Sequence, residues 1–183
     1  MFAFVAGGAA SGKSAWAEAA AMALGGRKIY IATMEPFGEE ASARIQKHRA
    51  ARQEKGFQTV EIYTGMDRRA RAICGDTVLL ECMTNWMANE MYSPSGVGKK
   101  ALEAVENGMA ALQAAVPNLV VVSGDLFCEG LDYGPYTGEY LENLANINRK
   151  LAVQADLVAE LCCGIPIIHR QTEAGRIWLE KMV

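Results

Sequence analysis

Eight residues near the start of the chain have the types and spacing of a phosphate-binding loop. The segment Gly7-Gly-Ala-Ala-Ser-Gly-Lys-Ser14 fits the pattern G-x-x-x-x-G-K-S, and the apolar run Phe2–Ala6 precedes it. In a strand, loop and helix in that order, backbone N–H groups and the helix N-terminus can hold a polyphosphate. Lys13 would contact the terminal phosphates, and the Ser14 hydroxyl would coordinate Mg²⁺. The alternative is a glycine-rich turn that only connects a strand to a helix.

A second group of candidate residues lies on a helix predicted from about residue 39 to 55. Arg44, His48 and Arg52 recur every four residues, so they form one tilted stripe on that helix. Like charges at this spacing repel each other and destabilise the helix. An anion bound across the stripe would remove this repulsion. A neutral imidazole at His48 can attack the α-phosphorus of a nucleoside triphosphate, while the arginines stabilise the phosphate charge. The stripe can equally be the solvated face of a surface helix.

Two further residues have positions that suggest a role. Glu81 ends the apolar run Thr77–Glu81, where P-loop enzymes carry the acidic residue that orients Mg²⁺ or its water. A carboxylate that marks the exit of a strand into solvent is the alternative. The other histidine of the chain, His169, follows an apolar strand and is typical of a packed or surface histidine.

The elements that must position these residues alternate between strands and helices. We expect strands at about residues 2–6, 28–33, 58–63, 77–81, 118–123, 157–161 and 165–168, the third of them at a sheet edge. Helices are expected at 15–24, 39–55, 67–73, 84–92, 99–116 and 138–155 and at the C-terminus. This pattern predicts an α/β fold, a mostly parallel sheet with helices on both faces. The phosphate loop, Thr33, Glu81 and Ser123 would then lie at the carboxyl ends of strands, where such sheets bind ligands.

Length and composition limit the class of protein. The 183 residues suit a single P-loop nucleotide-binding domain, 1–183, and a net charge of −3 gives no support for nucleic acid as a partner. Five cysteines and only two histidines make a zinc site a poor prediction. No stretch approaches 18 apolar residues, and the first apolar run is too short for a signal peptide. We therefore expect a cytoplasmic protein without a membrane partner.

Five segments of the first half form a more specific pattern than the phosphate loop alone. They are Gly7–Ser14, Tyr30-Ile-Ala-Thr33, Arg44-Ile-Gln-Lys-His-Arg-Ala-Ala-Arg52, Thr59-Val-Glu61 and Leu79-Leu-Glu-Cys-Met-Thr-Asn-Trp86. In this combination and order the sequence resembles the bifunctional adenosylcobinamide kinase / adenosylcobinamide-phosphate guanylyltransferase family of the cobalamin pathway.

The resemblance implies a fold, a reaction sequence and a set of site residues. Members have a RecA-like P-loop fold and form homotrimers. They phosphorylate adenosylcobinamide and then transfer GMP to adenosylcobinamide phosphate from a guanylylated histidine, which His48 matches. GTP, or ATP, would bind with Mg²⁺ on the phosphate loop. The implied nucleotide-binding residues are Gly7, Gly8, Ala9, Ala10, Ser11, Gly12, Lys13, Ser14, Thr33, Met34, Glu35, Arg49, Arg52, Glu61 and Glu81.

The second half of the chain departs from the family pattern. Ser123–Gly130 replaces an Asn-Glu-Val-Gly segment, Gly138–Asn148 replaces an arginine-rich helix, and Ala10 stands where an arginine is usual. The altered loop should face the second substrate. Two other functions therefore stay open: a small-molecule kinase without the histidine intermediate, and a nucleotide-binding switch or assembly subunit.

Overall fold

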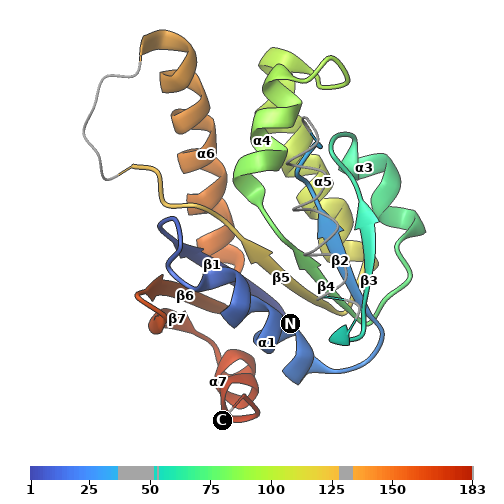
Figure 1. The fold of residues 1–183 in the computed structure, drawn as a ribbon, viewed down its shortest axis with the longest axis vertical. Helices are drawn as coiled ribbons and strands as arrows, with labels where there is room; N and C mark the ends of the chain where they lie inside the picture. Colours follow the sequence, from blue (N-terminus) through green and yellow to red (C-terminus); the bar gives the residue numbers. More distant parts are fainter. Residues whose placement is uncertain (37–51, 53, 128–133, 183) are drawn as a thin grey trace.

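Seven strands form one sheet in the order β3-β2-β4-β5-β1-β6-β7 (Figure 1). The structure is a computed structural model that describes residues 1–36, 52, 54–127 and 134–182. Neighbouring strands are parallel except for β6 and β7, which are antiparallel. The strands are β1 (Phe2–Gly7), β2 (Lys28–Ala32), β3 (Phe57–Glu61), β4 (Thr77–Leu80), β5 (Asn118–Val122), β6 (Leu157–Cys162) and β7 (Ile165–Gln171).

Helices cover both faces of this sheet. The helices are α1 (Lys13–Leu24), α3 (Met66–Arg69), α4 (Met83–Tyr92), α5 (Ala101–Ala115), α6 (Gly134–Gln154) and α7 (Glu173–Glu180), with short 3₁₀ turns η1 (Ala70–Ala72) and η2 (Gly98–Lys100). In Figure 1, α4, α5 and α6 lie on one side of the sheet, and α1 and α7 lie on the other. The buried side chains form two clusters, one for each face.

The larger cluster fills the space between the sheet and helices α3 to α6. Trp86 and Leu112, from α4 and α5, are completely buried there. Gly108 lets these helices approach closely, because a Cβ atom at this position would lie 2.6 Å from the Trp86 ring. Periodic apolar residues therefore build this face, as expected for amphipathic helices over a sheet.

The smaller cluster lies under α1. The helix faces the sheet with Ala17, Ala20 and Ala21, which are all completely buried. Side chains this small keep the helix close to the strands. At its flank, the Trp16 ring meets the Trp178 ring of α7 edge to face, with centroids 6.2 Å apart.

The observed elements confirm most of the predicted ones, with differences at several boundaries. The helix predicted at 39–55 falls almost entirely outside the described residues. Helix α1 begins at Lys13 rather than residue 15, and α6 begins at Gly134 rather than residue 138. The helix predicted at 67–73 is divided into α3 and η1. The last strand is longer than expected and exposed along its length. It is antiparallel because only Cys163 and Gly164 separate it from β6, and a parallel crossover needs a dozen or more residues.

Candidate nucleotide site

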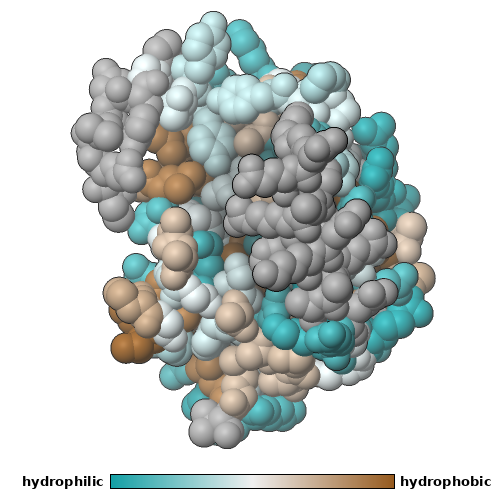
Figure 2. All heavy atoms as spheres, viewed as in Figure 1, coloured by the Kyte–Doolittle hydropathy of each residue, from teal (hydrophilic) through white to brown (hydrophobic). Residues whose placement is uncertain are grey.

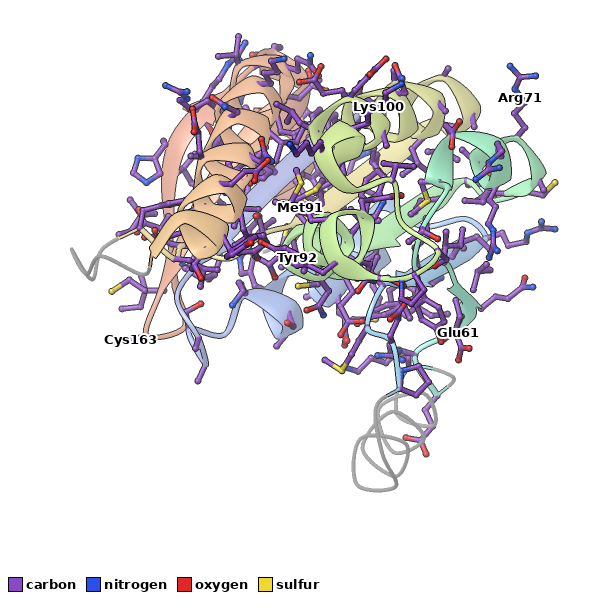
Figure 3. The ribbon with its side chains drawn as sticks, turned by 90° about the horizontal axis from the view of Figure 1, so that it is seen from above. Glu61, Arg71, Met91, Tyr92, Lys100 and Cys163 are labelled. Atoms are coloured by element: carbon purple, nitrogen blue, oxygen red, sulfur yellow. The ribbon has the colours of Figure 1, made fainter. Side chains whose placement is uncertain are left out.

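The candidate residues gather at the edge of the sheet where the parallel strands end. Glu61 is the last residue of β3, Thr33 follows β2, Glu81 follows β4, Ser123 follows β5, and the phosphate loop follows β1. In Figure 3 Glu61 and Cys163 lie toward the same edge at opposite ends of the sheet. Since β5 alone separates β4 from β1, strand spacing puts Glu81 roughly 10 Å from the phosphate loop.

The phosphate loop is closed by contacts within its own backbone. Gly12, with φ 92°, directly precedes α1, and the Trp16 N–H donates to its carbonyl at 3.1 Å. The Lys13 Nζ donates to the Gly8 carbonyl at 2.8 Å. Ala10 has φ 55°, a left-handed conformation that is costly for a residue with a Cβ atom. These contacts therefore hold the loop in a curled shape.

The turn between β6 and β7 supports this loop from outside. The Gly164 N–H donates to the Ser11 carbonyl at 2.8 Å. A Cβ atom at Gly7 would lie 2.8 Å from the Leu161 carbonyl oxygen, and one at Gly12 would lie 3.1 Å from the Gly164 Cα. The glycines of the motif therefore serve packing against β6 as well as loop curvature.

The loop has the features that a polyphosphate requires. Gly8, Ala9, Ala10, Gly12 and Ser14 are exposed, so a ligand can reach their amides. The Ser11 hydroxyl is buried and has no hydrogen-bond partner among the described residues. The first turn of α1 has no capping side chain, which leaves its N–H groups for an anion. These residues fit a nucleoside triphosphate.

A charged cluster surrounds Tyr30 on the α1 side of the sheet. Arg52 is 4% exposed, and its guanidinium lies over the Tyr30 ring, 3.9 Å from the centroid. Burial and the nearby Glu81 carboxylate raise the pKa of Tyr30 above its usual range, whereas the positive charge of Arg52 opposes this rise. Lys55 pairs with Glu18 of α1 at 2.5 Å. The cluster places Arg52 and Glu81, both predicted site residues, next to the same phenol.

Helix α4 holds the segment that follows β2. The Asn89 side chain donates to the Thr33 carbonyl at 2.7 Å and to the Tyr63 carbonyl at 3.2 Å. The Thr33 hydroxyl donates to the Cys82 carbonyl, and the Ser93 hydroxyl donates to the Glu35 carboxylate. Thr33 and Glu35 are thus held at the edge of the sheet by α4 and its two flanking residues, and this helix starts two residues after Glu81.

Glu61, at the outer strand, has a neighbouring phenol as partner. The Tyr63 hydroxyl donates to its carboxylate at 3.1 Å. Burial comes first among the causes that raise the pKa of Tyr63 to about 12, followed by this hydrogen bond and the charge of Glu61.

The end of β5 connects the phosphate loop to α6. Ser123 is completely buried and donates from its hydroxyl to the Asn148 side chain at 2.8 Å. The Asp125 N–H donates to the Gly7 carbonyl at 3.1 Å. The altered region of the sequence therefore begins in direct contact with the phosphate loop.

Three predicted residues, Arg44, His48 and Arg49, lie outside the described part of the chain. His169 is a surface residue, as expected, and its Nε2 lies 2.7 Å from the Glu160 carboxylate. No sequence pattern predicted the Asn89 and Gly164 contacts, which join residues 56 and 153 positions apart. Such contacts depend on the fold and leave no short motif.

Neither a metal cluster nor a membrane span is found among the residues that the structure covers. These residues contain no group of three or more His, Cys, Asp or Glu side chains able to hold a metal ion. None of their helices is long and apolar enough to cross a bilayer. A Mg²⁺ ion held by one or two side chains and by phosphate oxygens needs no such cluster.

Comparison with solved structures supports the fold. The KaiC-like protein PH0186 from Pyrococcus horikoshii superposes with a TM-score of 0.52 and 13% identity, over 94% of this chain and 80% of that protein. The sheet order and this likeness identify a RecA-like P-loop fold.

Comparison of sequences is more specific. The chain is 28% identical over 180 residues to the bifunctional adenosylcobalamin biosynthesis protein CobU of Escherichia coli K12, covering 91% of this chain and 98% of that protein. It is 26% identical to the corresponding protein CobP of Pseudomonas aeruginosa, covering 88% of this chain and 92% of that protein. The family model described as "Cobinamide kinase / cobinamide phosphate guanyltransferase" matches residues 3–168. The chain therefore belongs to the cobinamide kinase / cobinamide phosphate guanyltransferase family.

Proposed function

We propose that this chain is a bifunctional enzyme that phosphorylates adenosylcobinamide and then transfers GMP to the resulting phosphate. The observation that carries the proposal is the curled phosphate loop at the end of β1, with Glu81 at the end of β4 on one side of it. This arrangement supports GTP, or ATP, with Mg²⁺ as the phosphoryl donor.

In the kinase step, the hydroxyl of the acceptor attacks the γ-phosphorus of the triphosphate. A bond forms between that oxygen and phosphorus, the bond to the β,γ-bridging oxygen breaks, and the nucleoside diphosphate leaves with the electron pair. The O–H bond of the acceptor breaks in the same step, and its proton passes to solvent water. Lys13 moves from the Gly8 carbonyl to the terminal phosphates, and the loop amides hold the charge. Ser14 and Glu81 would hold Mg²⁺, directly or through its water, which neutralises the β- and γ-oxygens.

In the transferase step, His48 acts as the nucleophile. A neutral imidazole nitrogen attacks the α-phosphorus of GTP, pyrophosphate leaves, and GMP stays bound to the ring. The phosphate oxygen of adenosylcobinamide phosphate then attacks the same phosphorus and displaces the imidazole. Arg49 and Arg52 would stabilise the charge, and the buried position of Arg52 over the Tyr30 ring, which Glu81 also approaches, supports its part. Thr33, Met34, Glu35 and Glu61 would contact the nucleotide.

A product assay with adenosylcobinamide and GTP, followed by mass spectrometry, tests both steps. We expect the phosphorylated and the guanylylated product, and an acid-labile GMP adduct on the protein that His48→Ala abolishes. Lys13→Ala should lower the kinase rate by about 10²–10³-fold, as for loss of one donor to a developing oxyanion. Lys100→Ala is the matched control, since Lys100 is exposed and lies away from the edge that carries Glu61 (Figure 3).

Two results would point to the alternative functions. Phosphorylated product that survives His48→Ala, with no adduct on the intact protein, would indicate a small-molecule kinase without the histidine step. Tight nucleotide binding with neither product, and a change in oligomer size on binding, would indicate a switch or assembly subunit.

The family resemblance also supports three proposals about the whole protein. We infer a single domain over residues 1–183, a homotrimer in which a neighbouring subunit completes each site, and a cytoplasmic location. Size-exclusion chromatography with light scattering measures the oligomer, and a mass other than three chains would contradict the homotrimer.

A further inference from the structure

The turn between β6 and β7 carries two adjacent cysteines, which we call the thiol pair. Cys162 is the last residue of β6, Cys163 follows it, and both residues are exposed. Figure 3 labels Cys163 at the end of this hairpin. Its φ of 51° is left-handed, a conformation that few residues with a Cβ atom adopt. Neither thiol takes part in the steps proposed above.

The two thiols contact each other. Neighbouring side chains of a regular strand point to opposite faces, but here a hydrogen bond joins the two cysteine side chains. The negative charge of a Cys163 thiolate and this hydrogen bond raise the pKa of Cys162, and the Glu160 carboxylate adds to the rise. Cys162 therefore keeps its proton and donates it to the hydrogen bond, and the Cys163 sulfur accepts.

The residue after the thiol pair holds the phosphate loop. Gly164 directly follows Cys163, and its N–H donates to the Ser11 carbonyl at 2.8 Å. Its Cα packs so closely against the loop that a Cβ atom at Gly12 would lie 3.1 Å away. A change in the backbone between the two cysteines therefore displaces a residue that supports the loop.

From these observations we propose that the thiol pair is a redox modification site, at which a small-molecule disulfide forms a bridge between Cys162 and Cys163 and thereby loosens the phosphate loop. The effect on phosphate binding rests on the proposed function, whereas the bridge itself does not. In the first step the Cys163 thiolate attacks one sulfur of the oxidant, a mixed disulfide forms, and one thiolate leaves with the electron pair.

In the second step Cys162 completes the bridge. It loses its proton to solvent, its sulfur attacks the Cys163 sulfur, and the second thiolate leaves with the electron pair. The protein has then lost two hydrogen atoms, and the oxidant has been reduced to two thiols.

A bridge between adjacent residues changes the backbone of the turn. A trans peptide bond holds the Cα atoms of Cys162 and Cys163 about 3.8 Å apart. Disulfides usually join Cα atoms that are about 4.4–6.8 Å apart, so the turn must rearrange when the bridge forms. The rearrangement moves the Gly164 N–H away from the Ser11 carbonyl. Strained, exposed disulfides are readily reduced, which makes the change reversible.

Treatment of the protein with 2-hydroxyethyl disulfide, a small neutral oxidant, tests the inference. Peptide mapping by mass spectrometry should find a disulfide within the peptide that carries both cysteines, with the loss of two hydrogen atoms. Amide hydrogen exchange of residues 162–166 and of the phosphate loop should become faster, without any ligand present. The affinity for inorganic tripolyphosphate with Mg²⁺ should fall about fivefold, as for the loss of one hydrogen bond, and dithiothreitol should restore it.

Two variants serve as controls. Cys162→Ser keeps the Cys163 thiol and can form only a mixed disulfide, so its affinity for tripolyphosphate should survive the same treatment. Cys74→Ser removes an exposed thiol that lies outside the pair, and it should respond to the oxidant as the wild type does.

Three outcomes would contradict the inference. Mixed disulfides on both cysteines without a bridge would exclude the modification. A bridge that changes neither hydrogen exchange nor affinity would exclude its action on the loop, and so would an equal loss of affinity in oxidised Cys162→Ser. If the reduced wild type does not bind tripolyphosphate, the proposed phosphate site itself is wrong, and peptide mapping and hydrogen exchange still decide whether the bridge forms and loosens the loop.

Discussion

At the scale of single residues, the site depends on side chains that hold backbone in place. Asn89 is the clearest case, because its amide donates to two carbonyls from two different strand ends. Sequence motifs predicted Thr33 and Glu35, which Asn89 and Ser93 hold, but not the residues that hold them. Sequence motifs indicate the residues that contact a ligand. The residues that hold them in place depend on which helix packs against them in the fold.

Asn89→Ala should destabilise the protein by about 1–3 kcal/mol. The variant leaves the Thr33 and Tyr63 carbonyls without these donors, and hydrogen bonds to partly buried groups each contribute about 1 kcal/mol. We also expect a higher KM for GTP, since the Thr33–Glu35 segment loses its anchor. Urea unfolding and initial rates measure both effects. Asn143→Ala is the control, because within the described part of the chain the one hydrogen bond of its amide is to the Met91 sulfur, at 3.7 Å.

A pH effect is expected from Tyr140. Burial raises its pKa to about 12, and nearby Cys82 and Tyr92 add to the shift. Because the folded pKa exceeds the unfolded value of about 10, the stabilisation is complete below pH 10 and is lost as the pH rises from 10 through 12. A shift of two pKa units would correspond to about 2.7 kcal/mol in the free energy of unfolding. Solvent screening of this partly exposed side chain lowers that value.

Tyr140→Phe should therefore lose less stability between pH 9 and pH 12 than the wild type. Denaturant unfolding across that pH range measures the difference. Tyr136→Phe, at a residue that is 79% exposed, should keep the wild-type slope. An equal slope in all three proteins would contradict the assignment.

At the scale of elements, apolar periodicity placed nearly every strand and helix. The largest disagreement concerns β7, which the sequence places in a covered sheet and the structure leaves exposed. Ile165, Ile167 and Ile168 are 67%, 45% and 36% exposed. Figure 2 shows hydrophobic atoms at the outer edge where Figure 1 draws the β6–β7 hairpin. The isoleucines predict a strand but not its exposure, because β-branched residues favour strands whether a helix covers them or not.

Substitution of two helical glycines separates the effect of close packing on stability from the effect of helix propensity. Gly108→Ala should destabilise by about 1–3 kcal/mol, because the new methyl would lie 2.6 Å from the Trp86 ring. Gly138→Ala in α6 meets nothing within 4 Å and should stabilise by about 0.5–1 kcal/mol through helix propensity. Thermal unfolding of both variants measures the difference. Equal melting temperatures would contradict the close contact of α4 and α5.

At the scale of the whole molecule, the candidate site residues come from most of the chain. The phosphate loop, the ends of β2 to β5 and the turn after β6 all meet at one edge of the sheet. The first half of the sequence identified the nucleotide chemistry, because its motifs are local. The contacts by which α4, α6 and the β6–β7 turn hold the site depend on the tertiary arrangement, so local motifs do not predict them.

Ligand binding should therefore stabilise the entire domain. With GTP and Mg²⁺ at 100 times the Kd, mass action adds about 2.7 kcal/mol, which corresponds to a rise in Tm of about 5–10 °C for a chain of this size. Scanning calorimetry should show one transition that moves with GTP concentration and does not move in Lys13→Ala. Two transitions, only one of them sensitive to GTP, would contradict the single domain.

The three alanines under α1 have a consequence for the ligand that they never contact. Ala17, Ala20 and Ala21 leave no space between helix and sheet, so they fix the height of the first helical turn above β1. That height decides where the amide nitrogens after Gly12 stand relative to an incoming phosphate. A larger side chain at any of the three would push α1 away from the sheet. The amide N–H groups at the start of the helix would then point away from the anion, although every residue of the motif would still be present.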